Sequence, residues 1–389
     1  MGSIKSSKAK REQLGKVATS LNNKLKNVEW GKFRIGDLFQ VGTGSLLSST
    51  ELSMNGDIPR ISAKSDNNGV LNYLDSESLN NARHFNNFIS VNFFGSDGGI
   101  FYHPYKASVE MKVHTLKIPK IELNQRTGIF LCSALYKALH GFGYGDQLSS
   151  SKLRDLNLKI QLPIQNGEPD FAFMESFIAE LEMDRISELE TYLSVTGLSD
   201  YELTKEEKLA LEEYDSLTFK DFNITDIFNI KNTKSILSRD ICPNSGAIPY
   251  LCASADNNAI SSYISYDKKL LDTGNCIFIG GKTFVVTYQE CDFFSNDSHN
   301  LTLTLKNEDY RLKLSQIYLS TCVRKSLNHK YSWGDSISNN KIQKDKIRLP
   351  LTNNTVDYLK MKIFISAIQK LVIKDVVLYT DKKHFLIKK

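Results

Sequence analysis

The chain has 389 residues, 41% hydrophobic and 24% charged, with a formal net charge of +5. These fractions are typical of folded soluble proteins, and the length predicts two or three domains. No stretch approaches the roughly 20 apolar residues of a membrane span, and the basic, polar N-terminus lacks the apolar core of a secretory signal. We therefore expect a cytoplasmic protein with no membrane partner.

Residues 1–29 form a basic N-terminal segment without a motif that we can identify. Over residues 30–168, short β-branched and aromatic runs such as Val91–Phe94 alternate with turns such as Asn67–Gly69, which is typical of strands in a sheet. A helix is predicted at Gly128–His140. We therefore expect an α+β domain over 30–168 with a curved or barrel-like sheet.

Residues 169–216 have a different pattern. From Asp170 to Val195 apolar residues recur at spacings of mostly three or four, which predicts one long amphipathic helix, and Pro169 suits its start. In the linker that follows, Thr204 and Glu207 have the spacing of a capping box and predict a further short helix. We interpret 169–216 as a central spacer helix with its linker.

The rest of the chain repeats this plan. Ile58–Asn68 matches Ile248–Asn258 at an offset of 190, and four other matches keep the same order at offsets of 185 to 189. A nearly constant offset is the signature of an internal duplication. We therefore expect a second α+β domain over 217–353 and a second long helix, the C-terminal spacer helix, over 354–389.

The distribution of charge predicts how the long helices are covered. Residues 170–215 hold 14 acidic and 3 basic side chains, a local charge of −11, so the rest of the chain carries +16. The segment 355–389 has eight lysines and three acids. Opposite charges beside two apolar seams favour antiparallel, coiled-coil-like packing of the two helices. The cationic remainder suits DNA, although a solvated basic surface explains it equally well.

Motifs of enzymes are incomplete in this sequence. None of the eight prolines is adjacent to another, so the [DNS]-P-P-[YFW] motif of amino-methylating DNA methyltransferases is missing. Gly281–Thr283 resembles part of a nucleotide-binding loop, but Cys276 replaces the first glycine and a strand-like run follows. The six cysteines lack the spacing of zinc ligands. We expect no catalytic residue, no metal and no cofactor bound by this chain.

Four motifs together resemble the specificity subunits of Type I, and the related Type IIB, restriction-modification systems over essentially the whole chain. They are W-x-x-F-x-I-G-D-L-F (Trp30–Phe39), I-P-x-I-S-A-x-x-x-N-N-G (Ile58–Gly69), G-D-Q-L-S (Gly145–Ser149) and G-L-S-D-Y-E-L-T (Gly197–Thr204). The resemblance implies that each α+β domain is a target recognition domain that reads one half of a split site in double-stranded DNA. It also implies that the long helices set the spacing of the half-sites and dock methyltransferase subunits.

The resemblance further implies the partners of the chain. We expect two methyltransferase subunits, which use S-adenosylmethionine, and a restriction or translocase subunit is a further candidate. The acidic side chains of the central helix are our candidates for partner docking, namely Glu180, Glu182, Glu188 and Glu190. The chain itself would be a non-catalytic subunit.

Base reading needs side chains with hydrogen-bond donors and acceptors on loops that enter a groove of DNA. Our candidates in the first domain are Ser45, Lys64, Asn67, Asn68, Lys106 and Lys152. In the second domain they are Lys231, Lys234, Arg239, Ser254, Asn257, Asn258, Lys282 and Lys341. The asparagine pairs are equally plausible as turn formers. We therefore expect base discrimination from positions that differ between the copies, such as Lys64 against Ser254.

Four other residues, equivalent in pairs, have simpler interpretations. We expect His114 and His299 to be structural histidines within or beside a sheet, and Tyr144 and Trp333 to lie in the core. Two other functions stay open. A stand-alone duplicated DNA- or RNA-binding protein, such as a transcription regulator, would leave the acidic helix unexplained. A DNA-modifying enzyme with an unrecognised site conflicts with the missing motifs.

Overall fold

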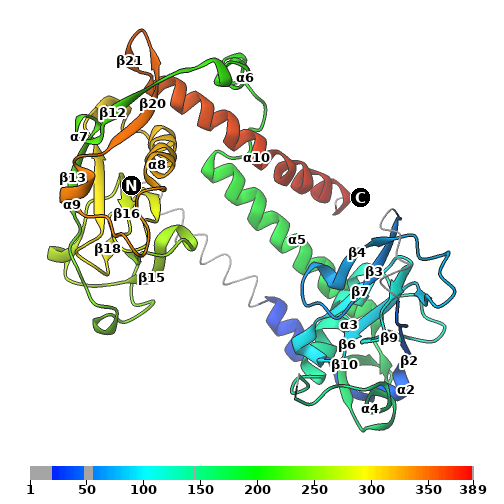
Figure 1. The fold of residues 1–389 in the computed structure, drawn as a ribbon. Coiled ribbons are helices and arrows are strands. Elements are labelled where there is room, and N and C mark those ends of the chain that lie inside the picture. The colour runs from blue at the N-terminus through cyan, green and yellow to red at the C-terminus, as the bar shows by residue number, and fades with distance from the viewer. Residues whose placement is uncertain (1–19, 48–55, 144, 388–389) are drawn as a thin grey trace. The chain divides into compact units, whose positions relative to one another are not determined.

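The structure is a computed structural model that describes residues 20–47, 56–143 and 145–387 (Figure 1). The chain divides into two compact units, Met1–Leu189 with Lys383–Lys389, and Glu190–Lys382. Both units combine strands and helices in nearly the same order along the chain. The prediction of a duplicated mixed α/β fold is confirmed. The curvature of the sheets and the antiparallel packing of the two long helices stay predictions.

Three sheets build the first unit. One is antiparallel, in the order β2 (Gln40–Thr43), β9 (Val113–Lys117), β6 (Phe88–Asn92) and β7 (Ile100–His103). The second, in the order β4 (Val70–Leu74), β3 (Ile58–Ile61), β8 (Ala107–Val109) and β5 (His84–Phe85), has β3 and β8 parallel. The third joins β1 (Trp30–Arg34), β10 (Lys159–Gln165) and β11 (Glu168–Pro169). The strand β6 is buried along its whole length, including its polar residues Ser90 and Asn92.

Helices cover the first unit's core. They are α2 (Ile35–Leu38), α3 (Gln125–Ala138), α4 (Ser150–Asp155) and the first part of α5 (Phe171–Thr196), with the 3-10 turns η1 (Asn67–Gly69) and η2 (Gly95–Gly98). A capping box of Asn124 and Thr127 starts α3 and satisfies backbone amides that would otherwise lack partners. Met174 and Ile178 bury the base of α5 in the same core. The long helix is therefore anchored to its own domain.

The second unit repeats these sheets. One is antiparallel, in the order β13 (Phe228–Asn232), β19 (Leu301–Leu305), β16 (Cys276–Ile279) and β17 (Val286–Gln289). The second has the order β15 (Ile260–Ile264), β14 (Ile248–Leu251) and β18 (Phe294–Ser295), and the third has β12 (Thr218–Asn223), β20 (Lys346–Thr352) and β21 (Thr355–Val356). As in the first unit, the second sheet contains a parallel pair, here β14 with β18.

The helices of the second unit include the linker. They are α6 (Lys205–Glu212), α7 (Ile224–Ile227), α8 (Lys313–Leu327), α9 (Asn339–Ile342) and α10 (Tyr358–Ile387). The 3-10 turns are η3 (Tyr214–Ser216), η4 (Ser238–Asp240), η5 (Asn257–Ala259), η6 (Lys268–Leu270) and η7 (Glu308–Tyr310). The predicted capping box of Thr204 and Glu207 is present at the start of α6. Among the described residues, no helix is long and apolar enough to cross a membrane.

A helix over residues 20–27 lies inside the segment from which we expected no motif. Its Leu21 is buried, Leu25 packs against the first unit's core, and the indole of Trp30 donates a hydrogen bond of 2.9 Å to the Leu25 carbonyl. Its Lys24 forms an ion pair with Glu180 on α5. This helix therefore belongs to the packing of the first unit, and the sequence signal for it is the spacing of its two leucines.

Candidate nucleic-acid interface

The repeated Asn-Asn pairs occupy matching tight turns. In η1, Asn67 and Asn68 have φ angles of 47° and 50°, and in η5, Asn257 and Asn258 have φ angles of 46° and 53°. This left-handed conformation is more accessible to asparagine than to most residues. The side-chain amide of Asn67 donates to the Val70 carbonyl at 3.0 Å, and that of Asn257 donates to Ile260 at 2.9 Å. The first asparagine of each pair therefore shapes the turn.

The second asparagines of the turns differ. The side-chain amide of Asn258 donates to the Tyr288 carbonyl at 3.0 Å. The carboxamide of Asn68 is exposed and has no hydrogen bond to another residue in the described part of the chain. Asn68 can therefore offer both its donor and its acceptor to a base edge, whereas Asn258 has part of this capacity committed to the fold.

The neighbouring positions Lys64 and Ser254 both have an acid two residues further on. The Lys64 ammonium lies 3.4 Å from the Asp66 carboxylate. The Ser254 hydroxyl lies 3.4 Å from the Asp256 carboxylate. The two copies thus present a partly neutralised cation and a hydroxyl at equivalent positions. This is the kind of difference from which the two domains could obtain different base preferences.

The G-D-x-x-S motif has a structural explanation. In the first copy, Lys152 forms an ion pair with Asp146 and donates to the Gln147 carbonyl at 2.8 Å, while Ser149 caps α4. In the second copy Lys341 pairs with Asp335 at 2.6 Å and donates to the Ser336 carbonyl at 2.9 Å, and Ser338 caps α9. Both lysines therefore hold a loop closed, a role that competes with reading DNA.

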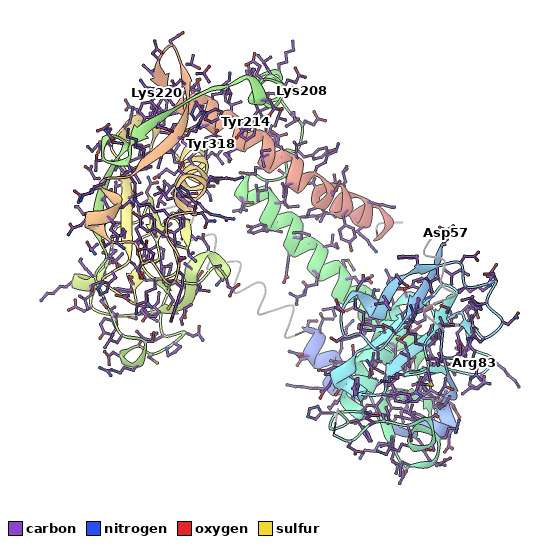
Figure 2. All side chains as sticks on the ribbon, viewed as in Figure 1. Asp57, Arg83, Lys208, Tyr214, Lys220 and Tyr318 are labelled. Carbon is purple, nitrogen blue, oxygen red and sulfur yellow. The ribbon has the colours of Figure 1, made fainter. Side chains whose placement is uncertain are left out.

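Two further candidates of the first domain also have partners within the protein. Lys106 forms an ion pair with Glu77 and, through a hydrogen bond, holds the pKa of that carboxyl below its ordinary value. The Ser45 hydroxyl accepts a hydrogen bond of 3.2 Å from the backbone amide of Arg83. Figure 2 labels Arg83, whose guanidinium donates to the Thr43 carbonyl at 3.1 Å.

The cationic candidates of the second domain are more exposed. Lys231 lies exposed on β13 and Arg239 lies in η4 with 80% of its side chain accessible. Lys234 is partly committed, because it donates to the Leu271 carbonyl at 2.8 Å. Lys282 follows β16 and lies 3.7 Å from Asp297.

The two equivalent histidines have different environments. His114 is buried, stacks on Phe93 at 4.5 Å between ring centroids and bonds to the Leu148 carbonyl at 2.8 Å. Its buried place within β9 confirms the structural interpretation for this residue, and burial lowers its pKa. His299, in contrast, has a side chain that is 77% exposed in the turn before β19, and the structural interpretation stays a prediction for it. In this exposed turn the ring of His299 bonds to Asp297.

His299 and Lys282 share one acid. The ring nitrogen Nδ1 of His299 lies 2.7 Å from the Asp297 carboxylate, which Lys282 also approaches. Burial raises the pKa of Asp297, but hydrogen bonds from the backbone and ring of His299 and the charge of Lys282 more than offset it, so the pKa is below its ordinary value. The ionised carboxylate thus orients two exposed side chains of the second domain.

The expected burial of Trp333 is also wrong, because the residue is 80% exposed. It stands in a short loop closed by the Ser332–Asp335 bridge, which leaves the indole without a core to enter. Its equivalent, Tyr144, lies outside the described residues. Sequence reasoning missed Trp333 as a surface residue, although its polar and glycine neighbours were a signal for exposure. An exposed indole can stack on a sugar or a base.

The acids proposed for docking have partners on or near α5. Glu180 pairs with Lys24, and Glu182 accepts from Arg126 of α3 at 3.0 Å. Glu188 pairs with Arg185 at 2.7 Å, and Glu190 also takes part in an interaction. Glu180, Glu182 and Glu188 are therefore partly neutralised by cations of their own unit. Two lysines of α10 have acidic partners in the linker, because Lys360 lies 2.9 Å from Glu213 and Lys370 lies 2.7 Å from Asp200.

The sequence of this chain matches, over residues 27–191 and again over 217–378, the family described as the Type I restriction modification DNA specificity domain. These two matches cover most of the chain and coincide with its two repeats. The chain therefore belongs to this family.

A relative and a solved structure extend this finding. The Type II restriction enzyme BgcI specificity subunit S.BcgI of Heyndrickxia coagulans is 30% identical over 159 residues, which span 41% of this chain and 45% of the relative. The match thus covers less than half of the relative's length. The crystal structure of a Type-I restriction-modification system S subunit from M. genitalium has a TM-score of 0.61, with 16% identity, over 93% of this chain and 94% of that chain. This likeness is one of fold.

Proposed function

We propose that the chain is the DNA-specificity subunit of a Type I or Type IIB restriction-modification complex. The observation that carries this proposal is the duplication of one domain with equal scaffolds and different exposed side chains. The turns η1 and η5 match in backbone, yet Lys64 faces Ser254 in the alignment of the copies, and only one of Asn68 and Asn258 keeps a free carboxamide in the described residues. Two such readers suit a split DNA site.

The exposed candidate residues have two different roles in binding DNA. Asn68 is the best placed to contact base edges in the first domain, whereas Lys231, Arg239 and Lys282 of the second supply positive charge for phosphates. The lysines that hold loops closed, Lys152 and Lys341, support the readers without touching bases. This division leaves sequence discrimination to a few side chains in each domain.

The long helices act as rulers between the readers. The helix α5 has 26 residues, or about 39 Å at 1.5 Å per residue. This length is comparable with the separation of about 34 to 36 Å between half-sites one DNA turn apart. Met174 and Ile178 anchor the base of α5 in the core of the first domain, as this role requires.

Catalysis belongs to partner chains in this proposal. Two methyltransferase subunits bind this cytoplasmic subunit and use S-adenosylmethionine, and a restriction or translocase subunit completes the cleaving complex. The acidic residues of α5, Glu180, Glu182, Glu188 and Glu190, contribute to docking. The isolated chain is accordingly expected to show neither methyl transfer nor cleavage of DNA.

The experiment that tests this function is methylome sequencing of cells with and without the gene. A bipartite methylated motif, with two short defined halves and an undefined spacer, should be present in the first and missing from the second. An identical methylome in both strains, or methylation by the purified chain alone, would contradict the proposal.

A further inference from the structure

Each repeat has a groove where the long helix leaves its domain, and the two grooves are equivalent. The first, about 810 Å³, is bounded by the helix over 20–27, β1, β10, α3 and α5. The second, about 540 Å³, is bounded by η3, β12, β20, α8 and α10. Both volumes fall in the range of binding pockets in proteins. Equivalent elements thus leave an open groove twice in one chain.

The floor of both grooves is aromatic at the same three positions. Trp30, Phe130 and Phe177 line the first groove, and Phe219, Tyr318 and Phe364 line the second at offsets of 187 to 189. In the second groove the Phe364 ring also stacks on Tyr214 at 4.2 Å, and Figure 2 labels Tyr214 and Tyr318 at this place. The residue types differ between the copies, whereas the aromatic character is kept. Aromatic side chains are typical anchors of protein interfaces.

Three exposed cations stand around each floor. They are Lys32, Lys137 and Lys159 in the first groove and Lys325, Lys346 and Arg348 in the second. Lys137 and Lys325 are equivalent, as are Lys159 and Lys346, while Asp221 replaces Lys32 in the second groove. In the part of the chain that the structure describes, none of the six forms an ion pair. Among their described lining residues, the first groove has no acid and the second has Asp221 beside three cations, so the lining of both grooves is net positive.

We infer that each groove binds an acidic segment of a partner protein that carries apolar side chains, so that one chain holds two copies of the same partner. This inference rests on the proposed function, in which the partner is the methyltransferase subunit. It places docking on the grooves more than on the acids of α5, because Glu180 and Glu182 already have cationic partners in their own unit. Two equivalent grooves explain a stoichiometry of two.

Duplex DNA is the less suitable occupant. Its phosphates would complement the cations, but its backbone offers no apolar side chain to cover three aromatic rings. In the first unit, moreover, the groove is lined by β1, β10, α3 and α5, whereas the turn η1 connects β3 and β4 of a different sheet. The groove and the candidate base-reading turn therefore belong to separate parts of the domain.

The test counts bound partners. The full chain is mixed with the purified methyltransferase subunit, and native mass spectrometry gives the number of copies. The variant K32E/K137E/K159E should bind one copy, K325E/K346E/R348E should also bind one, and the combined variant should bind none. At each changed groove the affinity should fall by about 30-fold or more. The variant K112E/K117E/K120E, with the same change of charge outside the groove, should keep two copies.

Tryptophan fluorescence gives a second, direct measurement of binding at the first groove. The chain has two tryptophans, so Trp333→Phe leaves Trp30, in the groove floor, as the sole reporter. Its fluorescence should shift when the methyltransferase binds, and the shift should vanish in K32E/K137E/K159E while the thermal melting of the variant stays unchanged. Neutral K32Q/K137Q/K159Q should give an intermediate affinity.

The outcomes separate the two proposals. If the unmodified chain binds no methyltransferase, the proposed function fails and this inference fails with it. If the unmodified chain binds two copies and the groove variants also bind two with unchanged affinity, the inference alone is overturned. Loss of DNA affinity in the groove variants, with two methyltransferase copies retained, would assign the grooves to DNA phosphates and overturn the inference as well.

Discussion

The ammonium of Lys370 on α10 lies 3.2 Å from the carboxylate of Glu207 on α6. Only 13% of the lysine side chain and 8% of the glutamate side chain are exposed, and Asp200 lies 2.7 Å from the same ammonium. Glu207 also accepts a hydrogen bond of 2.6 Å from Ser366. This network, in which Lys370 and Glu207 are nearly buried, fixes the acidic linker to the C-terminal long helix. It places the start of the second domain at a defined position on that helix.

Removal of the Lys370 charge should destabilise the second unit. In Lys370→Met, Glu207 keeps its charge in a buried place without its cationic partner, and the free energy of unfolding at pH 7 should fall by about 2 to 3 kcal/mol. Urea denaturation of the full chain measures this change. Glu207→Gln combined with Lys370→Met should lose less than the sum of the single changes, and strict additivity would show that the two side chains are not coupled.

The effect of Lys370→Met should depend on pH. Burial raises the pKa of Glu207, but hydrogen bonds from Ser366 and Thr204 and the contact with Lys370 outweigh it, so the folded pKa lies below the ordinary value of 4.5. The contribution of this carboxylate is therefore complete above pH 4.5 and disappears as the pH falls through the folded pKa. The difference in unfolding free energy between the two proteins should shrink below pH 4.5. A difference that grows on acidification would contradict the assignment.

Asn68→Gly should reduce base discrimination without loss of stability. Glycine accepts the left-handed turn at this position, so the change removes the carboxamide alone. If Asn68 reads a base, preference at one position of the first half-site should fall by about 10- to 100-fold, as measured by binding to a set of substituted duplexes. The matched variant Asn258→Gly should instead lower the stability by about 1 kcal/mol, because it removes the bond to Tyr288. Unchanged discrimination in Asn68→Gly would exclude the role.

Lys152→Met and Lys341→Met should weaken the fold slightly and leave the recognised sequence unchanged. Each lysine closes a loop through one ion pair and one carbonyl, and such partly exposed contacts contribute about 1 kcal/mol or less. Thermal denaturation measures the loss, and methylome sequencing measures the motif. A changed base in either half-site would show that the corresponding lysine reads DNA after all.

Four residues inserted after Arg185 should lengthen the spacer between the half-sites. The insertion adds about 6 Å to α5, close to the rise of two base pairs, while both readers stay intact. The methylated motif should keep both defined halves. A four-residue insertion in the β10–β11 turn at Asn166 and Gly167 is the control, because it leaves α5 unchanged and should leave the spacer unchanged too. An unaltered spacer in the α5 variant would contradict the claim that the length of α5 sets the spacing of the half-sites.

Patterns along the chain were sufficient for the architecture. The duplication follows from matching segments at a nearly constant offset. The long helices follow from the spacing of apolar residues, since periodicity is a local property. The capping box at Thr204 was equally local and is present. The helix over 20–27 was missed because its two leucines are too few to establish a period. The second long helix, expected over 354–389, is α10 (Tyr358–Ile387), which starts four residues later than expected.

The site was less predictable because pairing in three dimensions decides which side chains are available. Lys152 and Lys282 were both candidates from the sequence, yet Lys152 closes a loop while Lys282 is 67% exposed. The two grooves could not be predicted from the sequence for another reason. The lining residues of the first groove are spread along the chain from Leu25 to Leu181, and those of the second from Tyr214 to Ile365. At equivalent positions of the two copies, such as Trp30 and Phe219, only the aromatic character is kept. No alignment of identical residues within the chain could have found them.

The central claim is that each α+β domain reads one half of the DNA site by itself, and exchange of one domain tests it most directly. Residues 217–353 are replaced by a copy of residues 30–168, and the variant is expressed with its methyltransferase in cells that lack the original gene. The methylome should then contain a site built twice from the first half-site, with the second half-site lost. Methylation of the original, unaltered motif would contradict independent reading by the two domains.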